Sequence, residues 1–119
     1  MVFIEAPAFT RHVLSYLTDD ELRRLQAALL ANPEAGAVMP GTGGFRKMRW
    51  RDSRRSKGTR GGLRVVYYHF PSEAQVWMMT LYDKNELEDL TAAEKRALKA
   101  AIDAEREARA ARRSTARKR

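Results

Sequence analysis

The chain reads FRKMRW at residues 45–50, LRVVYYHF at 63–70 and VWMMTLY at 76–82. All three runs are rich in apolar, β-branched or aromatic residues, and a basic link that contains glycine separates the first run from the second. Runs of this kind, bounded by glycine and proline, are typical of β-strands. The sequence therefore predicts three successive strands, and the turn signal at residues 71–73 predicts that the last two are antiparallel neighbours.

Positive charges gather on one face of these predicted strands. Successive side chains of a strand point to opposite faces of a sheet. Met48 and Trp50 therefore share one face, while Lys47 and Arg49 share the other. Arg64 lies within the second run, among β-branched and aromatic residues. A cation in a half-buried strand needs a physical reason, so this face is where we expect a functional site.

Length and composition exclude several classes of protein. The chain has 119 residues, which suits one domain with one core, and it contains no cysteine and only two histidines. The absence of cysteine excludes a disulfide framework and a thiolate metal site, and the presence of only two histidines disfavours a histidine-rich metal site. No apolar run approaches the roughly 20 residues that span a bilayer. We therefore expect a soluble, cytoplasmic protein that does not contact a membrane.

The net charge of +8 is unevenly distributed along the chain. Residues 46–64 carry a net +8 and residues 91–119 a net +6, whereas residues 1–45 and 65–90 are net acidic. Clustered Lys and Arg with a pI near 10.3 indicate a phosphate-binding surface. We prefer that interpretation for the central block, where charges alternate with aromatic residues, and a solvated charged face for the C-terminal block.

Local signals place helices on both sides of the predicted strands. A short strand at Val2-Phe3-Ile4 precedes a helix whose first turn holds Pro7. Thr18 and Glu21 form a capping box that begins a second helix at Asp19, and Asn32-Pro33 ends it. These two helices form a hairpin with one apolar side, and the segment 37–44 that follows is predicted to be a loop.

A second capping box, at Thr91 and Glu94, predicts the start of the last helix. Leu98 and Ile102 are its apolar residues, and no large apolar residue follows them. We therefore predict a domain over residues 1–103 and a basic helical extension over 104–119, with disorder from residue 112 onward.

The charged face suits chemistry on a phosphodiester. Lys47, Arg49 and Arg64 can converge there, with Tyr68, Tyr82 and Lys84 near the strand ends. Arginine and lysine donors stabilise the extra charge of a phosphorane-like transition state. An RNA 2′-hydroxyl supplies its own nucleophile, so such a site needs a base and an acid but no metal or cofactor.

Less specific interpretations remain open at this point. Plain nucleic-acid binding would produce much of the same pattern. Arg64 also suits a strand arginine paired with an acidic residue such as Asp83. His69 suits a sheet edge, and His12 suits the polar face of a helix.

Four ordered motifs resemble the RelE toxin superfamily, nearest to its HigB-type branch. They are NPEAG at residues 32–36, PGTGGFRKMRW at 40–50, GGLRVVYY at 61–68 and YDKNE at 82–86 with DLT at 89–91. The resemblance covers about residues 2–102. It implies an α+β fold in which an N-terminal helical hairpin packs on a small antiparallel sheet, with a C-terminal helix.

The resemblance also implies a function. It indicates the toxin of a type II toxin–antitoxin system, a metal-independent endoribonuclease that cleaves mRNA in the A site of the 70S ribosome and so inhibits translation. Its implied partners are the ribosome, mRNA and a cognate antitoxin protein of helix-turn-helix type. Two alternatives stay open, namely a DNA gyrase inhibitor of the ParE branch, which shares the fold, and a non-catalytic nucleic-acid-binding relative.

Site residues are carried over by position. The residues that match catalytic positions are Lys47, Arg49, Arg64, Tyr82 and Lys84. The residues expected to contact RNA or the ribosome are Arg46, Arg51, Arg54, Arg55, Lys57, Arg60, Tyr68 and Asn85. The chain departs from relatives such as RelE at Asn85, where they have an arginine, and near Thr91, where they have a catalytic tyrosine. Lys84 or Tyr82 would fill that gap.

Overall fold

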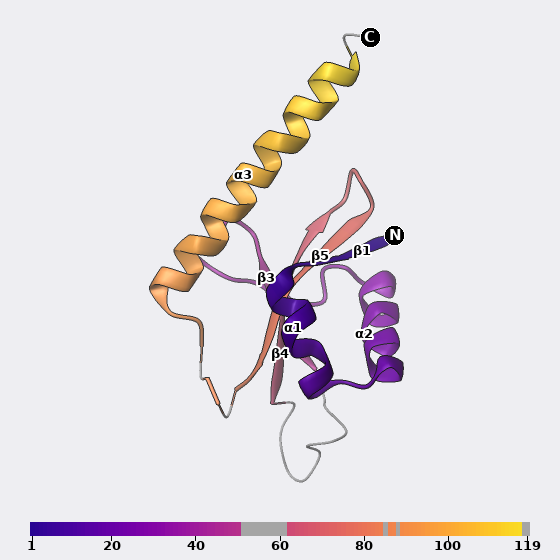
Figure 1. Cartoon of the computed structure of the whole chain (residues 1–119), viewed down its shortest axis with the longest axis vertical. Coiled ribbons are helices and arrows are strands. Elements are labelled where there is room, and N and C mark those ends of the chain that lie inside the picture. The colour runs from indigo at the N-terminus through magenta and orange to yellow at the C-terminus, as the bar shows by residue number, and fades with distance from the viewer. Residues whose placement is uncertain (51–61, 85, 88, 118–119) are drawn as a thin grey trace.

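A five-stranded sheet forms the centre of the molecule in the computed structural model, which describes residues 1–50, 62–84, 86–87 and 89–117 (Figure 1). The strand order is β1-β5-β4-β3-β2. The strand bounds are β1 Val2–Glu5, β2 Ala37–Val38, β3 Arg46–Trp50, β4 Leu63–Phe70 and β5 Gln75–Asp83. β4 and β5 are the longest and form the hairpin that the turn signal predicts. The three strands expected from the sequence are thus confirmed as β3, β4 and β5.

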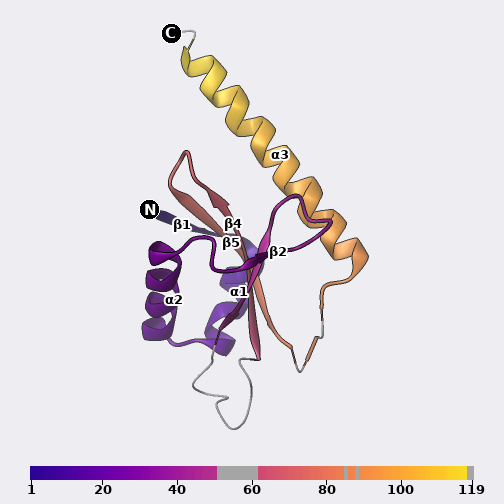
Figure 2. The ribbon, with the colours of Figure 1, turned by 180° about the vertical axis from the view of Figure 1, so that it is seen from behind.

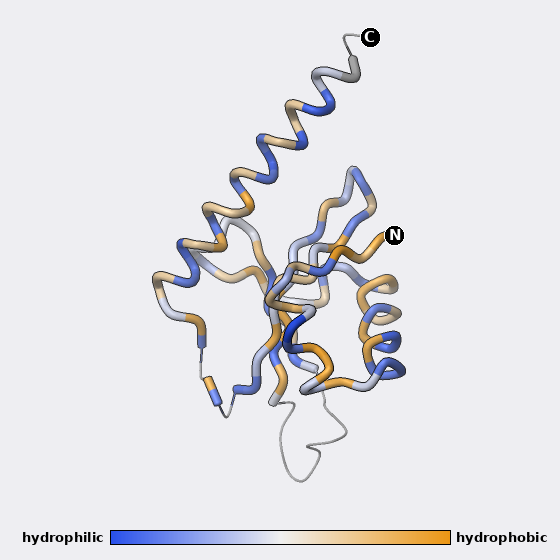
Figure 3. The backbone as a smooth tube through the Cα atoms, viewed as in Figure 1, coloured by the Kyte–Doolittle hydropathy of each residue, from blue (hydrophilic) through white to orange (hydrophobic). Residues whose placement is uncertain are grey.

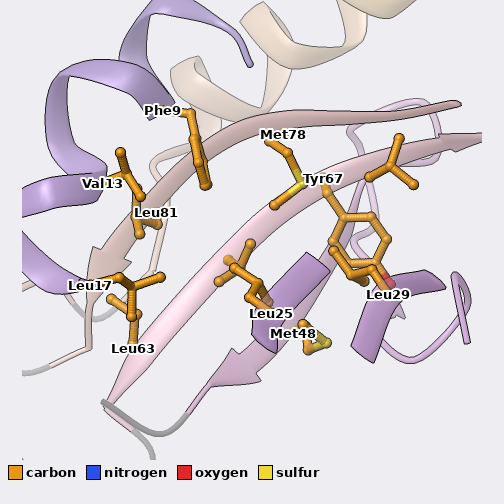
Figure 4. Packing of buried hydrophobic residues seen from close by; sticks show 12 residues of the cluster. Phe9, Val13, Leu17, Leu25, Leu29, Met48, Leu63, Tyr67, Met78 and Leu81 are labelled. Atoms are coloured by element: carbon orange, nitrogen blue, oxygen red, sulfur yellow. The ribbon is translucent and has the colours of Figure 1, made fainter. Parts of the chain in front are cut away.

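Two helices cover one face of this sheet. α1 spans Pro7–Tyr16 and α2 spans Asp19–Ala31, and the predicted capping box is present at Thr18 and Glu21. Apolar residues of both helices pack on one parity of the strands, including Leu63, Val65 and Tyr67 of β4 (Figure 4). The main core therefore lies between the helical hairpin and the sheet, as the apolar side of the hairpin predicts.

The third helix crosses the opposite face (Figure 2). α3 spans Ala92–Arg117, and its first turn is closed by the predicted capping box of Thr91 and Glu94. Leu98 and Ile102 are buried against a second cluster that includes Phe45 and Val66. The fold is α+β, and the sheet is sandwiched between the hairpin and the first half of α3.

The sheet differs from the expected one in two ways. β1 pairs with β5 in the parallel direction, so the sheet is mixed rather than wholly antiparallel. Parallel neighbours need a long connection between them. Here α1, α2 and three further strands separate β1 from β5 in the sequence. A short strand, β2, also pairs with β3 inside the segment that the glycines and proline predict to be a loop.

The end of α3 also differs from the expectation. The helix continues to Arg117, whereas disorder is predicted from residue 112. Figure 3 shows that the C-terminal half of α3 carries hydrophilic and weakly hydrophobic residues. Two arginines nevertheless attach it to the sheet, because Arg106 stacks over Tyr68 and Arg109 lies 3.7 Å from the ring centre of Phe70. Guanidinium stacking on aromatic rings replaces the apolar contacts that the sequence lacks there.

Candidate functional site

A cleft of about 840 Å³ opens where β3, β4 and the segment after β5 meet. Its described lining residues are Ala35, Ala37, Lys47, Met48, Arg49, Arg64, Lys84 and Asp89. Four of the five residues predicted to be catalytic are therefore brought together in one cleft, although they come from three separate strands or strand ends. Only one acidic side chain lies among these lining residues.

Two arginines lie directly opposite each other in the cleft. In the antiparallel pairing of β3 and β4, Arg49 is the partner of Arg64. Arg64 is buried, with 6% of its surface exposed, whereas Arg49 is exposed. Like charges opposite each other on neighbouring strands destabilise a sheet. A phosphodiester in the cleft would offer the acceptor oxygens that arginine binds best.

Two lysines complete the cationic lining. Lys47 lies on β3 and shares a face with Arg49. Lys84 follows β5, where its backbone N–H donates to the carbonyl of Gly62 at 2.6 Å and so fixes the chain beside the start of β4. Within the described part of the chain, the side chains of Arg49 and Lys84 form no hydrogen bond or ion pair. Both cations line the cleft.

Tyr82 lies behind the cleft rather than on it. It is paired with Arg64 across β4 and β5, belongs to the cluster beneath α3, and is only 7% exposed. Burial raises the pKa of the Tyr82 hydroxyl, and the nearby Asp89 carboxylate raises it further. The hydroxyl has no hydrogen-bond partner among the residues that the structure describes.

Asp89 is the charged cleft residue that was not among the predicted site residues. One carboxylate oxygen lies 3.4 Å from Nζ of Lys47 and accepts a 2.7 Å hydrogen bond from the Leu90 N–H. The other lies 3.2 Å from Nζ of Lys95, on the first turn of α3. Asp89 precedes the Thr91 capping box by two positions, so in sequence it looks like an ordinary residue before a helix.

The predicted contact residues Arg46 and Tyr68 lie elsewhere. Arg46 has the parity of Met48, so its side chain is on the opposite face from Lys47, where it donates to the carbonyl of Gly36 at 2.8 Å. Tyr68 shares a face with Arg64 but is buried under α3, where Arg106 donates to its hydroxyl. The remaining predicted contact residues lie outside the described residues: Arg51, Arg54, Arg55, Lys57, Arg60 and Asn85.

One wall of the cleft is held in place by Tyr67. Its buried hydroxyl donates to the Pro33 carbonyl at 2.9 Å and accepts from the Gly36 N–H at 2.8 Å. Burial raises the pKa of this hydroxyl. A Cβ at Gly36 would lie 3.0 Å from both the Tyr67 ring and the Lys47 carbonyl, which explains the glycine. The segment fixed in this way carries Ala35 and Ala37 into the cleft lining.

The described residues contain neither a candidate metal site nor a candidate membrane-spanning helix. No group of three or more His, Asp or Glu side chains there is placed to hold a metal ion. None of the described helices is long and apolar enough to cross a membrane.

No protein-family model matches the chain. Solved structures with a similar arrangement include the intact E. coli RelBE toxin–antitoxin complex, at 17% identity and a TM-score of 0.49 over 69% of this chain and 94% of that one. A mutant of E. coli toxin RelE in the free state matches at 16% identity and a TM-score of 0.49, over 81% of this chain and 93% of that one. The isolated E. coli RelE toxin matches at 17% identity and a TM-score of 0.47, over 84% and 97%.

All three structures contain RelE, from the superfamily that the sequence motifs resemble. With identities of 16–17% and TM-scores of 0.47–0.49, these likenesses do not identify the chain. Its α+β fold is defined by its own strands and helices.

Proposed function

We propose that this protein is a RelE-like toxin of a type II toxin–antitoxin system, and that it cleaves mRNA on the ribosome. The observation that carries the proposal is the opposed pair Arg49 and Arg64 in a cleft that also holds Lys47 and Lys84. Four cations on one small concave surface favour a ligand with a phosphate backbone. The ordered sequence motifs favour RNA and the ribosome as the setting.

The proposed reaction is an internal transfer at phosphorus. The 2′-oxygen of the substrate attacks the adjacent phosphorus, the bond to the 5′-oxygen breaks, and a 2′,3′-cyclic phosphate and a free 5′-hydroxyl result. A base takes the proton of the 2′-hydroxyl, and an acid donates a proton to the departing 5′-oxygen. The residues of the chain therefore need to supply only proton transfer and charge stabilisation.

Roles for the cleft residues follow from their surroundings. In the proposed reaction, Arg49 and Arg64 bind the two non-bridging oxygens and stabilise the added charge in the transition state. Lys47, which faces the Asp89 carboxylate, suits a charged donor to phosphate. Lys84, whose side chain has no partner among described residues, suits proton transfer.

The proposed partners are the ribosome with its mRNA and a cognate antitoxin that binds the toxin directly. Net positive charge favours association with ribosomal RNA through the phosphate backbone. The cytoplasm is where these partners are found. The antitoxin and its helix-turn-helix type rest on the resemblance in sequence motifs.

The first test compares mRNA cleavage by the intact chain with that by Arg64→Ala in a bacterial translation extract, mapped by primer extension with and without ribosomes. We expect cleavage that requires ribosomes and that falls by at least about 100-fold in the variant, because a preorganised donor to a developing charge contributes on that scale. Circular dichroism and binding to the antitoxin show whether the variant is folded.

A matched control is Arg24→Ala, which removes the same charge from an exposed position of α2 on the other side of the sheet. It should cleave like the intact chain. Uncut message in every lane would overturn the nuclease proposal, and a gyrase supercoiling assay would then test the ParE-type alternative.

A further inference from the structure

The cleft contains an anion of its own. Asp89 contacts Lys47 and Lys95 through its two carboxylate oxygens, at 3.4 and 3.2 Å, and it is 44% exposed. It thus lies in a cleft whose other charged lining residues are all cations. A carboxylate in this position occupies the side of Lys47 that a phosphate oxygen would need.

The surroundings of Asp89 keep it ionised. Partial burial acts to raise its pKa, but the Leu90 N–H, the hydrogen bond from Lys95 and the charge of Lys47 outweigh this effect and lower the pKa overall. A carboxylate with a lowered pKa is a weak proton acceptor at neutral pH. Its position is therefore better explained by its charge than by proton transfer.

We propose that Asp89 raises the affinity threshold of the cleft, because it competes with the phosphate backbone for Lys47 and Lys95. Nucleic acid that enters the cleft must displace the Asp89 carboxylate from both lysines. The negative charge of Asp89 also repels the phosphates. The inference rests on the proposed function only in that the cleft receives a phosphate backbone, and it does not require that the bond is cleaved.

The physical benefit is discrimination against the wrong polyanion. A chain with a net charge of +8 binds any nucleic acid through its phosphates. A penalty common to all ligands does not change the ratio of two affinities, but it lowers the occupancy of the site by ligands that are held weakly, by charge alone. A ligand that is held only by charge is then rejected, whereas a message presented by the ribosome retains the other contacts of the complex.

A purely structural role for Asp89 makes a different prediction. The bond to the Leu90 N–H could serve only to start α3. The variant Asp89→Asn separates the two roles, because the amide oxygen still accepts from that N–H while the negative charge is lost. If the role is only structural, affinity for nucleic acid should not change.

The test measures the binding of a fluorescently labelled 2′-O-methyl RNA oligonucleotide, which cannot undergo the proposed cleavage, by anisotropy over a series of salt concentrations. Asp89→Asn should bind about fivefold more tightly at low salt, since two partly exposed lysine pairs no longer compete. Its plot of log K against log salt should be steeper by about 0.7–1.4, which corresponds to one or two more phosphate contacts on a single strand.

The matched control is Asp103→Asn. Asp103 lies on α3 and pairs with Lys99 at 2.8 Å, with a similar exposure of 47%, but outside the cleft. Asp103→Asn makes the same change in net charge as Asp89→Asn. Because Asp103 lies outside the cleft and salt screens its charge, the affinity of this variant for RNA should stay within about twofold of that of the intact chain. Equal affinities for the two variants, or weaker binding by Asp89→Asn, would overturn the proposal.

Cleavage measured in parallel separates this inference from the proposed function. Tighter binding by Asp89→Asn supports the competing role whatever the rate of cleavage by this variant. Cleavage lost with unchanged binding would make Asp89 part of the proton-transfer machinery and overturn the competing role. If no variant cleaves RNA, the binding result still decides the role of Asp89, and reduced binding by Arg64→Ala shows whether the cleft is the site that receives phosphate.

Discussion

Individual side chains in this protein show how differently two buried hydroxyl groups can be used. Tyr67 and Tyr82 are both almost fully buried, and burial raises the pKa of both hydroxyls. Tyr67 makes two hydrogen bonds, to the Pro33 carbonyl and from the Gly36 N–H. Tyr82 makes none with the described residues. Removing the hydroxyl should therefore have opposite consequences at the two positions.

Tyr67→Phe should lower the free energy of unfolding by about 1–3 kcal/mol, because it leaves a buried N–H and a carbonyl unsatisfied. Tyr82→Phe should leave stability unchanged or raise it slightly, since it removes a buried group without a partner. Urea denaturation of both variants measures these values. Equal losses of unfolding free energy at the two positions would contradict the conclusion that the two hydrogen bonds of the Tyr67 hydroxyl stabilise the wall of the cleft.

Tyr82→Phe also tests the catalytic role that the motifs imply for this residue. We expect cleavage to be retained, because the hydroxyl does not line the cleft. A large loss of cleavage at unchanged stability would instead identify Tyr82 as the proton donor to the departing oxygen.

At the scale of elements, α3 is attached to the sheet by two different kinds of contact. Its first half uses the buried side chains Leu98 and Ile102. Its second half uses arginines, and Glu73 at the tip of the β4–β5 hairpin accepts from Arg113 at 2.8 Å and lies 3.8 Å from Arg109. The hydrogen bond from Ser72 and the charges of these arginines lower the pKa of Glu73. The second half of α3 is thus held by ion pairs with Glu73 as well as by the stacking of arginines on aromatic rings.

Glu73→Gln should loosen the second half of α3 without affecting the first. Amide hydrogen exchange over residues 106–113 should become about threefold faster, in keeping with the small strength of exposed ion pairs. Exchange near Ile102 should not change. The control Glu107→Gln makes the same substitution at an exposed position of the same helix. An equal effect of both variants would argue that helix charge, and not the hairpin contact, holds this half in place.

At the scale of the whole molecule, two apolar clusters share one sheet and extend along the chain no further than Ile102. The second half of α3 projects beyond the sheet and contributes to the long dimension of 56 Å (Figure 1). The domain boundary near residue 103 stays a prediction, and removal of the extension tests it.

Deletion of residues 104–119 should therefore give a chain that still unfolds cooperatively. Its stability should fall by about 1–2 kcal/mol, because the stacking of Arg106 on Tyr68 and of Arg109 on Phe70 is lost. Thermal denaturation followed by circular dichroism measures the change. Failure of the shortened chain to fold would mean that the extension is an integral part of the domain.

Much of the fold could be predicted from the sequence because it depends on neighbours along the chain. The capping boxes at Thr18 and Thr91 each fix a helix start with residues three apart. Alternation along β3 puts Lys47 and Arg49 on one face. The parallel pairing of β1 was not predicted because its partner, β5, lies far along the chain. β2 was not predicted because two residues beside proline and glycine carry no strand pattern, although its partner β3 is close in sequence.

The candidate site was predicted only in part, for the same reason. Parity within each strand identified the cations, but parity cannot show how far along a strand a neighbour lies. Tyr68 has the parity of Arg64 and yet lies under α3. Arg46 is different, because its parity with Met48 already indicates the other face of the sheet. Asp89 was missed because its two lysine partners are 42 and 6 residues away.

The sequence by itself determined the class of fold, the helix starts and the charged face of each strand, since periodicity and capping act over a few residues. Only the tertiary structure decided that Arg49 meets Arg64, that Asp89 enters their cleft and that arginines fasten α3 to aromatic rings. Those contacts depend on strand register and on the packing of distant elements, which no local pattern specifies.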